Sequence, residues 1–99
     1  MYRNMTDPAI LILTSLLDGD KHGYAMVQDI ERFAEMRMGP GTLYGAITRL
    51  EEQGWIEPLE PVDRRRPYRL TPAGRRHIEE QMSGMDRVVK TALRRLRHA

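Results

Sequence analysis

Two amphipathic helix patterns in this sequence are separated by only a short break. The first pattern occupies residues 23–35, where apolar side chains recur at helical spacing: Tyr24, Val27, Ile30 and Ala34. Residues 36–40 interrupt it, and Thr42 is a suitable N-cap for a further helix that ends near Gly54. The apolar residues of this helix share one face: Leu43, Ala46, Ile47 and Leu50. Such a helix pair with a short connection is typical of a helix-turn-helix.

A more apolar helix precedes this pair. Asp7 is a suitable N-cap and Pro8 suits the first helical position, so we expect a helix that ends near Gly19. Its apolar residues cover most of the circumference: Ile10, Leu11, Leu13, Leu16 and Leu17. A helix of this kind has to be buried on more than one side, either within its own domain or against a second chain.

A hairpin pattern follows the helix pair. Trp55, Ile56 and Leu59 are typical strand residues, and Pro58 favours an edge strand. Residues 68–70 alternate apolar and charged side chains, which places Tyr68 and Leu70 inward and Arg69 outward. Between the two strands lies an arginine-rich turn, so the segment predicts a short basic β-hairpin.

Thr71 and Pro72 repeat the cap-and-proline signal, and no proline interrupts the sequence after them. The last helix should extend about 40 Å at 1.5 Å per residue, which is too long for so small a domain to cover. We therefore expect a mainly α-helical fold with a small β-hairpin. A winged helix-turn-helix domain would span residues 1–70, and a dimerisation helix would span residues 71–99.

The charge is distributed unevenly along the chain. Residues 1–63 contain five Lys or Arg and eleven Asp or Glu, whereas residues 64–99 contain eleven Lys or Arg and three Asp or Glu. This segregation favours a polyanionic partner, of which nucleic acid is the commonest, while acidic proteins and lipid head groups stay open. The chain has no cysteine, which suits a reducing compartment, and we expect it in the cytoplasm and not in a membrane.

The third helix supplies the first candidate DNA contacts. Residues near the N-terminus of a recognition helix reach base edges. The candidates at that place are Thr42, Tyr44, Gly45, Thr48 and Arg49. Hydroxyl groups bind phosphate or bases, a glycine permits close backbone approach, and arginine can pair with guanine. The alternative is an ordinary solvated helix face.

The hairpin supplies the second group of candidates. Arg64, Arg65 and Arg66 lie at its expected tip, where they can reach phosphates or the minor groove, and Arg69 points outward. Lys21 and His22, at the start of the second helix, are further phosphate candidates. A solvated loop and a nuclear-localisation signal are the alternatives for the arginine run.

The last helix has a heptad seam that predicts a homodimer. Its residues are Ile78, Met82, Met85, Val89, Ala92 and Leu96. Val88 and Leu93 widen the apolar stripe, and from the first helix we expect Leu13 and Leu17 to join the interface. Packing on the chain's own domain is the alternative, and adsorption to a membrane surface is disfavoured because acidic residues lie on the polar face.

Catalysis finds little support in the sequence. Ser15 and Ser83 do not lie in a GxSxG motif, and the three histidines lack metal-ligand spacing. We therefore expect neither an enzyme nor a cofactor or metal.

Three stretches resemble one known family. They read HGYAMVQDIE (22–31), GPGTLYGAITRLEEQGWIE (39–57) and RRRPYRLTPAGRR (64–76). These resemble the PadR family of bacterial transcriptional regulators, in which HGY opens the second helix, PGTLY opens the third, and Y-x-LT-x-x-G closes the wing. The resemblance covers residues 9–76, and the short length resembles the subfamily with a single C-terminal helix.

This resemblance implies a homodimer that binds a pseudo-palindromic operator in double-stranded DNA, usually as a repressor. It is released when a small aromatic or cationic effector or another signal arrives, and we expect such an effector at the dimer interface. It also implies that Thr42 and Tyr44 enter the major groove while Arg64, Arg65 and Arg66 form the wing. The chain departs from the family at Gly45, where a proline is common, and its single tryptophan, Trp55, lies in the wing and not in the last helix. The competing hypothesis is a protein-interaction module that docks an acidic partner without DNA binding.

Overall fold

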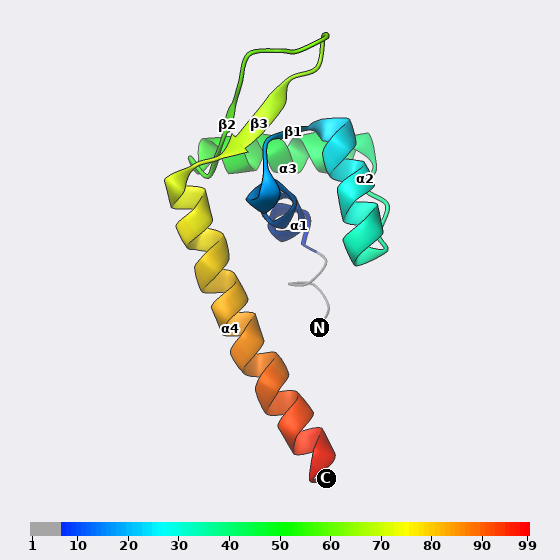
Figure 1. Ribbon diagram of the computed structural model, residues 1–99, viewed down its shortest axis with the longest axis vertical. Coiled ribbons are helices and arrows are strands. Elements are labelled where there is room, and N and C mark those ends of the chain that lie inside the picture. The colour runs from blue at the N-terminus through cyan, green and yellow to red at the C-terminus, as the bar shows by residue number, and fades with distance from the viewer. Residues whose placement is uncertain (1–6) are drawn as a thin grey trace.

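The computed structural model describes residues 7–99, and in this part of the chain a group of four α-helices carries a small three-stranded antiparallel sheet at one end (Figure 1). In chain order the elements are α1 (Pro8–Ser15), the 3-10 turn η1 (Leu16–Asp18), β1 (Lys21–His22), α2 (Gly23–Ala34), α3 (Pro40–Glu52), β2 (Ile56–Pro58), β3 (Pro67–Leu70) and α4 (Pro72–Arg97). The first six residues of the predicted 1–70 domain lie outside the described part. The winged helix-turn-helix architecture with a long last helix is confirmed.

Two of the predicted helix starts are confirmed in detail. The Asp7 carboxylate accepts a hydrogen bond from the Ala9 N–H at 2.8 Å, with Pro8 as the first helical residue. The Thr71 hydroxyl accepts from the Gly74 N–H at 3.0 Å, with Pro72 in the same place. Each cap satisfies an N–H that has no partner within its helix, which fixes where α1 and α4 begin.

The predicted start of α3 was wrong by three residues. Gly39 is the N-cap and Pro40 is the first helical residue, whereas Thr42 lies exposed in the first turn. Proline fits the first position because it has the helical φ and lacks only an N–H that would have no partner there. The Thr42 hydroxyl is therefore free of a capping role.

The core-facing side of α2 also differs from the prediction. Met26 and Ile30 are fully buried, while Tyr24 is 58% exposed. Gly23 explains the rotation of the helix: a Cβ there would lie 2.7 Å from the Tyr44 hydroxyl and 3.1 Å from Leu43 Cδ2. The glycine must therefore face α3, and this orientation turns Tyr24 outward.

The core surrounds α1, which lies between α2 and α4 and packs against α3 (Figure 1). The largest fully buried side chains are Ile12, Leu13, Met26, Ile30, Ile47, Leu50 and Ile78. Leu13 and Ile78 are only 1% and 0% exposed within a single chain. Both were predicted to lie in a dimer interface, and we correct this because neither has surface left for a partner. Leu17 is half-buried and keeps such surface.

The sheet has the order β1-β3-β2. The predicted hairpin is confirmed, with Glu57 opposite Arg69 and Pro58 opposite Tyr68, and Pro58 lies on an edge strand as expected. The short strand β1 was not predicted. It pairs Lys21 with Tyr68, and a strand of this length has no periodicity that a sequence could display.

The first turns of α4 belong to the core of the domain. A Cβ on Gly74 would lie 2.0 Å from the Trp55 carbonyl oxygen, so only glycine permits this approach. The His77 ring stacks on the Trp55 ring with 3.7 Å between centroids. The core thus continues past the predicted boundary at residue 70, and α4 then projects away from the domain (Figure 1). No helix within residues 7–99 combines the length and apolar character that a membrane crossing requires.

Candidate nucleic-acid interface

One face of α3 is exposed and polar. Its opposite face holds the core residues, all of which are buried as predicted: Leu43, Ala46, Ile47 and Leu50. Tyr44 is 52% exposed, and Thr48 and Arg49 are exposed one turn further along. The Thr48 hydroxyl donates to the Tyr44 carbonyl oxygen at 2.9 Å, which leaves its oxygen free to accept from a base amino group.

The two glycines next to Tyr44 in space have different roles. Gly23 lets the Tyr44 ring lie over the N-terminus of α2, because any side chain there would meet its hydroxyl. A Cβ on Gly45 would meet only Arg49 Nη1, at 3.7 Å, so nothing in residues 7–99 requires this glycine. Gly45 instead leaves the outer surface of α3 open to close approach by another molecule.

The wing ends in a tight turn formed by Asp63 and Arg64. Their φ angles are +50° and +66°, and Val62 and Arg65 exchange backbone hydrogen bonds of 2.8 and 3.0 Å across the turn. Two left-handed residues are characteristic of a type I′ hairpin turn, in which asparagine and glycine are the usual residues. Figure 1 shows this tip at the opposite end of the molecule from the free end of α4.

The arginines of the wing are not equivalent. Arg64 lies in the tip turn itself, whereas the Arg66 Nη1 donates to the Leu59 carbonyl oxygen at 2.7 Å and so joins the two sides of the hairpin. Arg69 donates to the Glu57 carboxylate at 2.6 and 2.9 Å. This pair raises the pKa of the Arg69 guanidinium and compensates its charge. Arg69 does point outward as predicted, but its guanidinium already pairs with the Glu57 carboxylate.

Arg65 lies against the start of α2. Its Nη1 is 3.3 Å from His22 Nε2, and its guanidinium carbon is 5.7 Å from the centroid of the Tyr24 ring. A shallow cleft between the wing and β1 contains this contact and is also lined by Asp20 and Asp63. His22 is the N-cap of α2, as its place in the sequence suggested.

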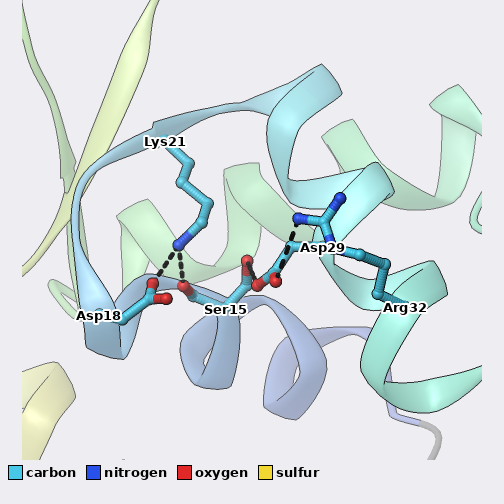
Figure 2. Close-up of polar contacts among 5 residues, drawn as sticks. All are labelled: Ser15, Asp18, Lys21, Asp29 and Arg32. Carbon is cyan, nitrogen blue, oxygen red and sulfur yellow. Dashed lines mark hydrogen bonds and ion pairs between the residues drawn. The ribbon is translucent and has the colours of Figure 1, made fainter.

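The ammonium group of Lys21 binds groups outside this cleft. Figure 2 shows its ammonium group donating to the Ser15 carbonyl oxygen and to the Asp18 carboxylate at the end of α1. The hydrogen bond from Lys21 lowers the pKa of Asp18. Lys21 was predicted as a phosphate contact, and we correct this because its donors already satisfy groups of α1 and η1.

A polar link that the sequence did not indicate joins α1 to α2 beside Lys21 (Figure 2). The buried Ser15 hydroxyl donates to the Asp29 carboxylate at 2.7 Å, and Arg32 lies 3.6 Å from the same carboxylate. The signal in the sequence was weak, because Ser15 is a polar residue at the end of a largely apolar helix. The link fixes α2, and with it His22 and Gly23, relative to α1.

The second half of α4 carries apolar side chains that pack against nothing in the described part of the chain. Val88 is 68% and Leu96 71% exposed, and Val89 and Leu93 are also exposed. Gly84, Val88, Ala92 and Leu96 line a shallow groove flanked by Arg87 and Arg95. Met82 still packs against the domain core, and Met85 is half-buried. Within residues 7–99, no group of three or more His, Asp or Glu is placed to hold a metal ion.

Comparison with known proteins gives consistent results. The sequence profile of the transcriptional regulator PadR-like family matches residues 12–80. A transcriptional regulator of Mycobacterium tuberculosis is 34% identical over 85 residues, which cover 83% of this chain and 78% of that protein. A 37.1 kDa protein in the transposon Tn4556 of Streptomyces fradiae is 46% identical over 82 residues. The match covers 83% of this chain but only 24% of the Streptomyces protein.

Two solved structures have the same fold. A transcriptional regulator from Clostridium thermocellum superimposes with a TM-score of 0.79 at 27% identity, and the alignment covers 94% of each chain. A PadR family transcription regulator from Clostridium difficile gives a TM-score of 0.80 at 24% identity, covering 90% of this chain and 97% of that one.

Proposed function

Because this chain belongs to the PadR-like family of transcriptional regulators, we propose that it acts as a homodimer that binds a pseudo-palindromic operator through α3 and the wing. We further propose that it is a cytoplasmic repressor and that an effector at the dimer interface releases it. The observation that carries the proposal is the placement of an open polar helix face and a basic hairpin tip at the end of the molecule opposite an uncovered apolar helix (Figure 1).

In this proposal α3 reads the sequence. The exposed face carries Tyr44, Thr48 and Arg49. Because Gly45 has no side chain, the backbone of α3 can approach the bases of a DNA groove closely. Thr42 lies exposed in the first turn, where the N–H groups of a helix favour a phosphate. Arg49 can pair with guanine O6 and N7 in the major groove.

The wing then supplies contacts that do not depend on sequence. Arg64 lies exposed in the tip turn, and its left-handed backbone fixes the direction in which the side chain leaves the hairpin. Arg66 and Arg69 are tied to Leu59 and Glu57, so we assign them a smaller part in binding than the sequence suggested. Contacts to phosphate position the protein on the duplex, and contacts to base edges specify the site.

The uncovered half of α4 supports the homodimer. A single exposed helix with a continuous apolar stripe is not stable in water, because most helix stability comes from packing of that stripe. The residues proposed for the interface are Leu17, Met82, Met85, Val89, Ala92, Leu93 and Leu96, and Val88 extends the stripe. A symmetric pair of α4 helices would leave both wings outside the interface and free for DNA.

The test is a titration of labelled duplex DNA followed by fluorescence anisotropy at several salt concentrations. Each phosphate contact should contribute a slope of about −0.9 to log K against log salt. Arg64→Ala should reduce that slope by about 1 on any sequence, whereas Arg49→Ala should lower affinity for the operator more than for random DNA. Arg94→Ala is the matched control, since it removes an exposed arginine from the far end of α4.

The same titration separates DNA binding from docking of an acidic protein, the competing function for a basic wing. A steep salt dependence that Arg64→Ala weakens supports the DNA-binding regulator. No affinity for duplex DNA at low salt, with the protein dimeric and folded, would contradict it and leave the protein-interaction module.

A further inference from the structure

Trp55 lies where three parts of the molecule meet. Its N–H donates to the Leu50 carbonyl oxygen of α3 at 3.0 Å, and the next residue begins strand β2 of the wing. The Trp55 carbonyl oxygen accepts the Thr71 N–H at 3.0 Å, and Thr71 is the N-cap of α4. Residues 54–55 and Thr71 therefore form a junction between α3, the wing and α4.

Further contacts at this junction fix the point at which α4 begins. The Thr71 hydroxyl donates to the Gly54 carbonyl oxygen at 2.7 Å and accepts from the Gly74 N–H at 3.0 Å. Gly74 packs so closely on the Trp55 carbonyl group that a Cβ would lie 2.0 Å from its oxygen. All these contacts lie within the first turn of α4, so they hold its start but leave its direction to the next turn.

Two contacts in the second turn of α4 determine its direction. Ile78 is fully buried and packs into the hydrophobic core. His77 projects about 100° away from Ile78 around the helix axis. Its ring stacks on the Trp55 ring with 3.7 Å between the centroids and 12° between the planes. Core packing therefore restrains α4 in one direction, and the stacked rings restrain it in a second, roughly perpendicular direction. Both rings are half-buried, so the stack can be removed without opening the core.

The length of α4 amplifies any change of its direction at the junction. From His77 to its last residue, Arg97, the helix extends about 30 Å at 1.5 Å per residue. A tilt of about 10° at His77 would therefore displace the far end by about 5 Å. In the homodimer proposed above, the second half of α4 is held against a partner. The same tilt would then displace α3 and the wing relative to the rest of the dimer.

We propose that His77 and Trp55 are positioning residues that fix the angle between α4 and the wing, and thereby the operator spacing that the dimer accepts. The consequence for DNA rests on the function proposed above. One additional base pair moves two half-sites about 3.4 Å apart and rotates one against the other by about 34°. A dimer with rigid junctions cannot follow this change, whereas a dimer with loose junctions can. The stacked rings thus make the protein selective for half-site spacing.

Three variants test the stack. His77→Gln removes the ring and keeps a side chain that favours a helix, and His77→Phe restores a ring that can stack. His98→Gln is the matched control, because His98 is exposed at the end of the same helix. Trp55 is the only tryptophan of the chain, so its fluorescence reports on this junction alone. Acrylamide should quench that fluorescence more strongly in His77→Gln than in the natural protein, and as in the natural protein in the other two variants.

The direction of α4 is measured without DNA, by double electron–electron resonance between spin labels on α2 and α4. The chain has no cysteine, so labels attach only to the exposed positions changed in Gln28→Cys and Arg94→Cys. An excess of unlabelled protein leaves one labelled chain in each dimer. About 26 Å of helix separates His77 from Arg94, so a loss of 10° in precision should broaden the distance distribution by about 2 to 4 Å in His77→Gln. Equal widths in His77→Gln and the natural protein, or a broad distribution in His77→Phe, would overturn the proposal.

The last measurement compares three spacings of a duplex selected by binding from fragments of the source genome. Since a rigid dimer has to deform the duplex, one base pair added or removed between the half-sites should weaken binding of the natural protein about tenfold, and of His77→Gln only about threefold. Equal dependence on spacing in both would contradict the link between the stack and the operator. A natural protein that binds no duplex would refute the proposed function, and the label distances would still decide whether the stack fixes α4.

Discussion

Replacement of Gly74 by alanine tests whether α4 is held against the base of the wing. An added Cβ would lie 2.0 Å from the Trp55 carbonyl oxygen and 3.0 Å from Leu70 Cδ1. Carbon and oxygen are ordinarily about 3.3 Å apart in close contacts, so the carbonyl group or the helix must move by about 1.3 Å. The Trp55 oxygen also accepts the Thr71 N–H at 3.0 Å, so the movement strains the residue that caps α4.

Overpacking of this severity costs about 3 kcal/mol, the upper end of the usual range. For a chain of about 100 residues this corresponds to a Tm lower by roughly 12 to 24 °C. Gly84→Ala is the matched control on the same helix, because its Cβ would meet only Arg87 Nη2 at 3.8 Å. Alanine is favoured over glycine within a helix by about 1 kcal/mol, so this variant should be more stable.

The assay is unfolding by urea and by heat at one protein concentration. The oligomeric state is determined in parallel. The two substitutions are chemically the same, so only their surroundings can give opposite signs. If Gly74→Ala unfolds at the same urea concentration as the natural protein, the close packing of α4 on Trp55 is refuted. A loss of stability in Gly84→Ala without a change in oligomeric state would refute the open surroundings of that residue.

Three further outcomes follow from other parts of the molecule. Asp63→Gly should raise the stability by about 1 kcal/mol in urea unfolding, because glycine tolerates the left-handed backbone of the wing tip; no gain would argue against the type I′ turn. Val89→Asp should shift the protein from dimer to monomer in sedimentation velocity at micromolar concentration, and Lys90→Asp, on the polar side of α4, should leave the dimer intact. Asp18→Asn should be less stable than the natural protein at pH 7, because Lys21 lowers the pKa of Asp18 only in the folded state. The difference should begin to shrink as the pH falls below the ordinary pKa of an aspartate and should vanish below the lowered pKa, where protonation removes the pair. A difference that does not shrink at all in acid would contradict the ion pair.

The strongest sequence signals were those that depend on neighbouring residues alone. The caps at Asp7 and Thr71, the core face of α3 and the two strands of the hairpin were all predicted correctly. Each of these depends on local hydrogen bonding or on the period of apolar residues, which a sequence displays directly.

The errors concern features that are fixed by packing between distant segments. Tyr24 lies outside the core because Gly23 must face Tyr44, and periodicity cannot show which of two adjacent positions a neighbouring helix approaches. Leu13 and Ile78 were predicted in an interface because apolar residues of the chain's own core and of a partner look alike in sequence. The engagement of Lys21 with α1 depends on how the chain turns after η1.

The site was predictable in outline and not in its internal contacts. The exposed face of α3 and the position of Arg64 follow from spacing and turn chemistry. Arg69 pairs with Glu57 because the strand register places the two residues opposite each other. Arg65 contacts His22 because the unpredicted strand β1 lies beside the wing. The HGY stretch was the sequence signal for these contacts, because its histidine contacts the wing and its glycine faces α3.

Hydroxyl-radical footprinting on a bound fragment selected from the source genome tests the paired arrangement of recognition helices most directly. If two copies of α3 enter successive major grooves, the protected regions should form two half-sites about 10 base pairs apart on one side of the duplex. The Val89→Asp variant should lose both together. Protection of a single continuous segment, or two half-sites that the monomeric variant still protects, would contradict a dimer that reads DNA with paired helices and wings.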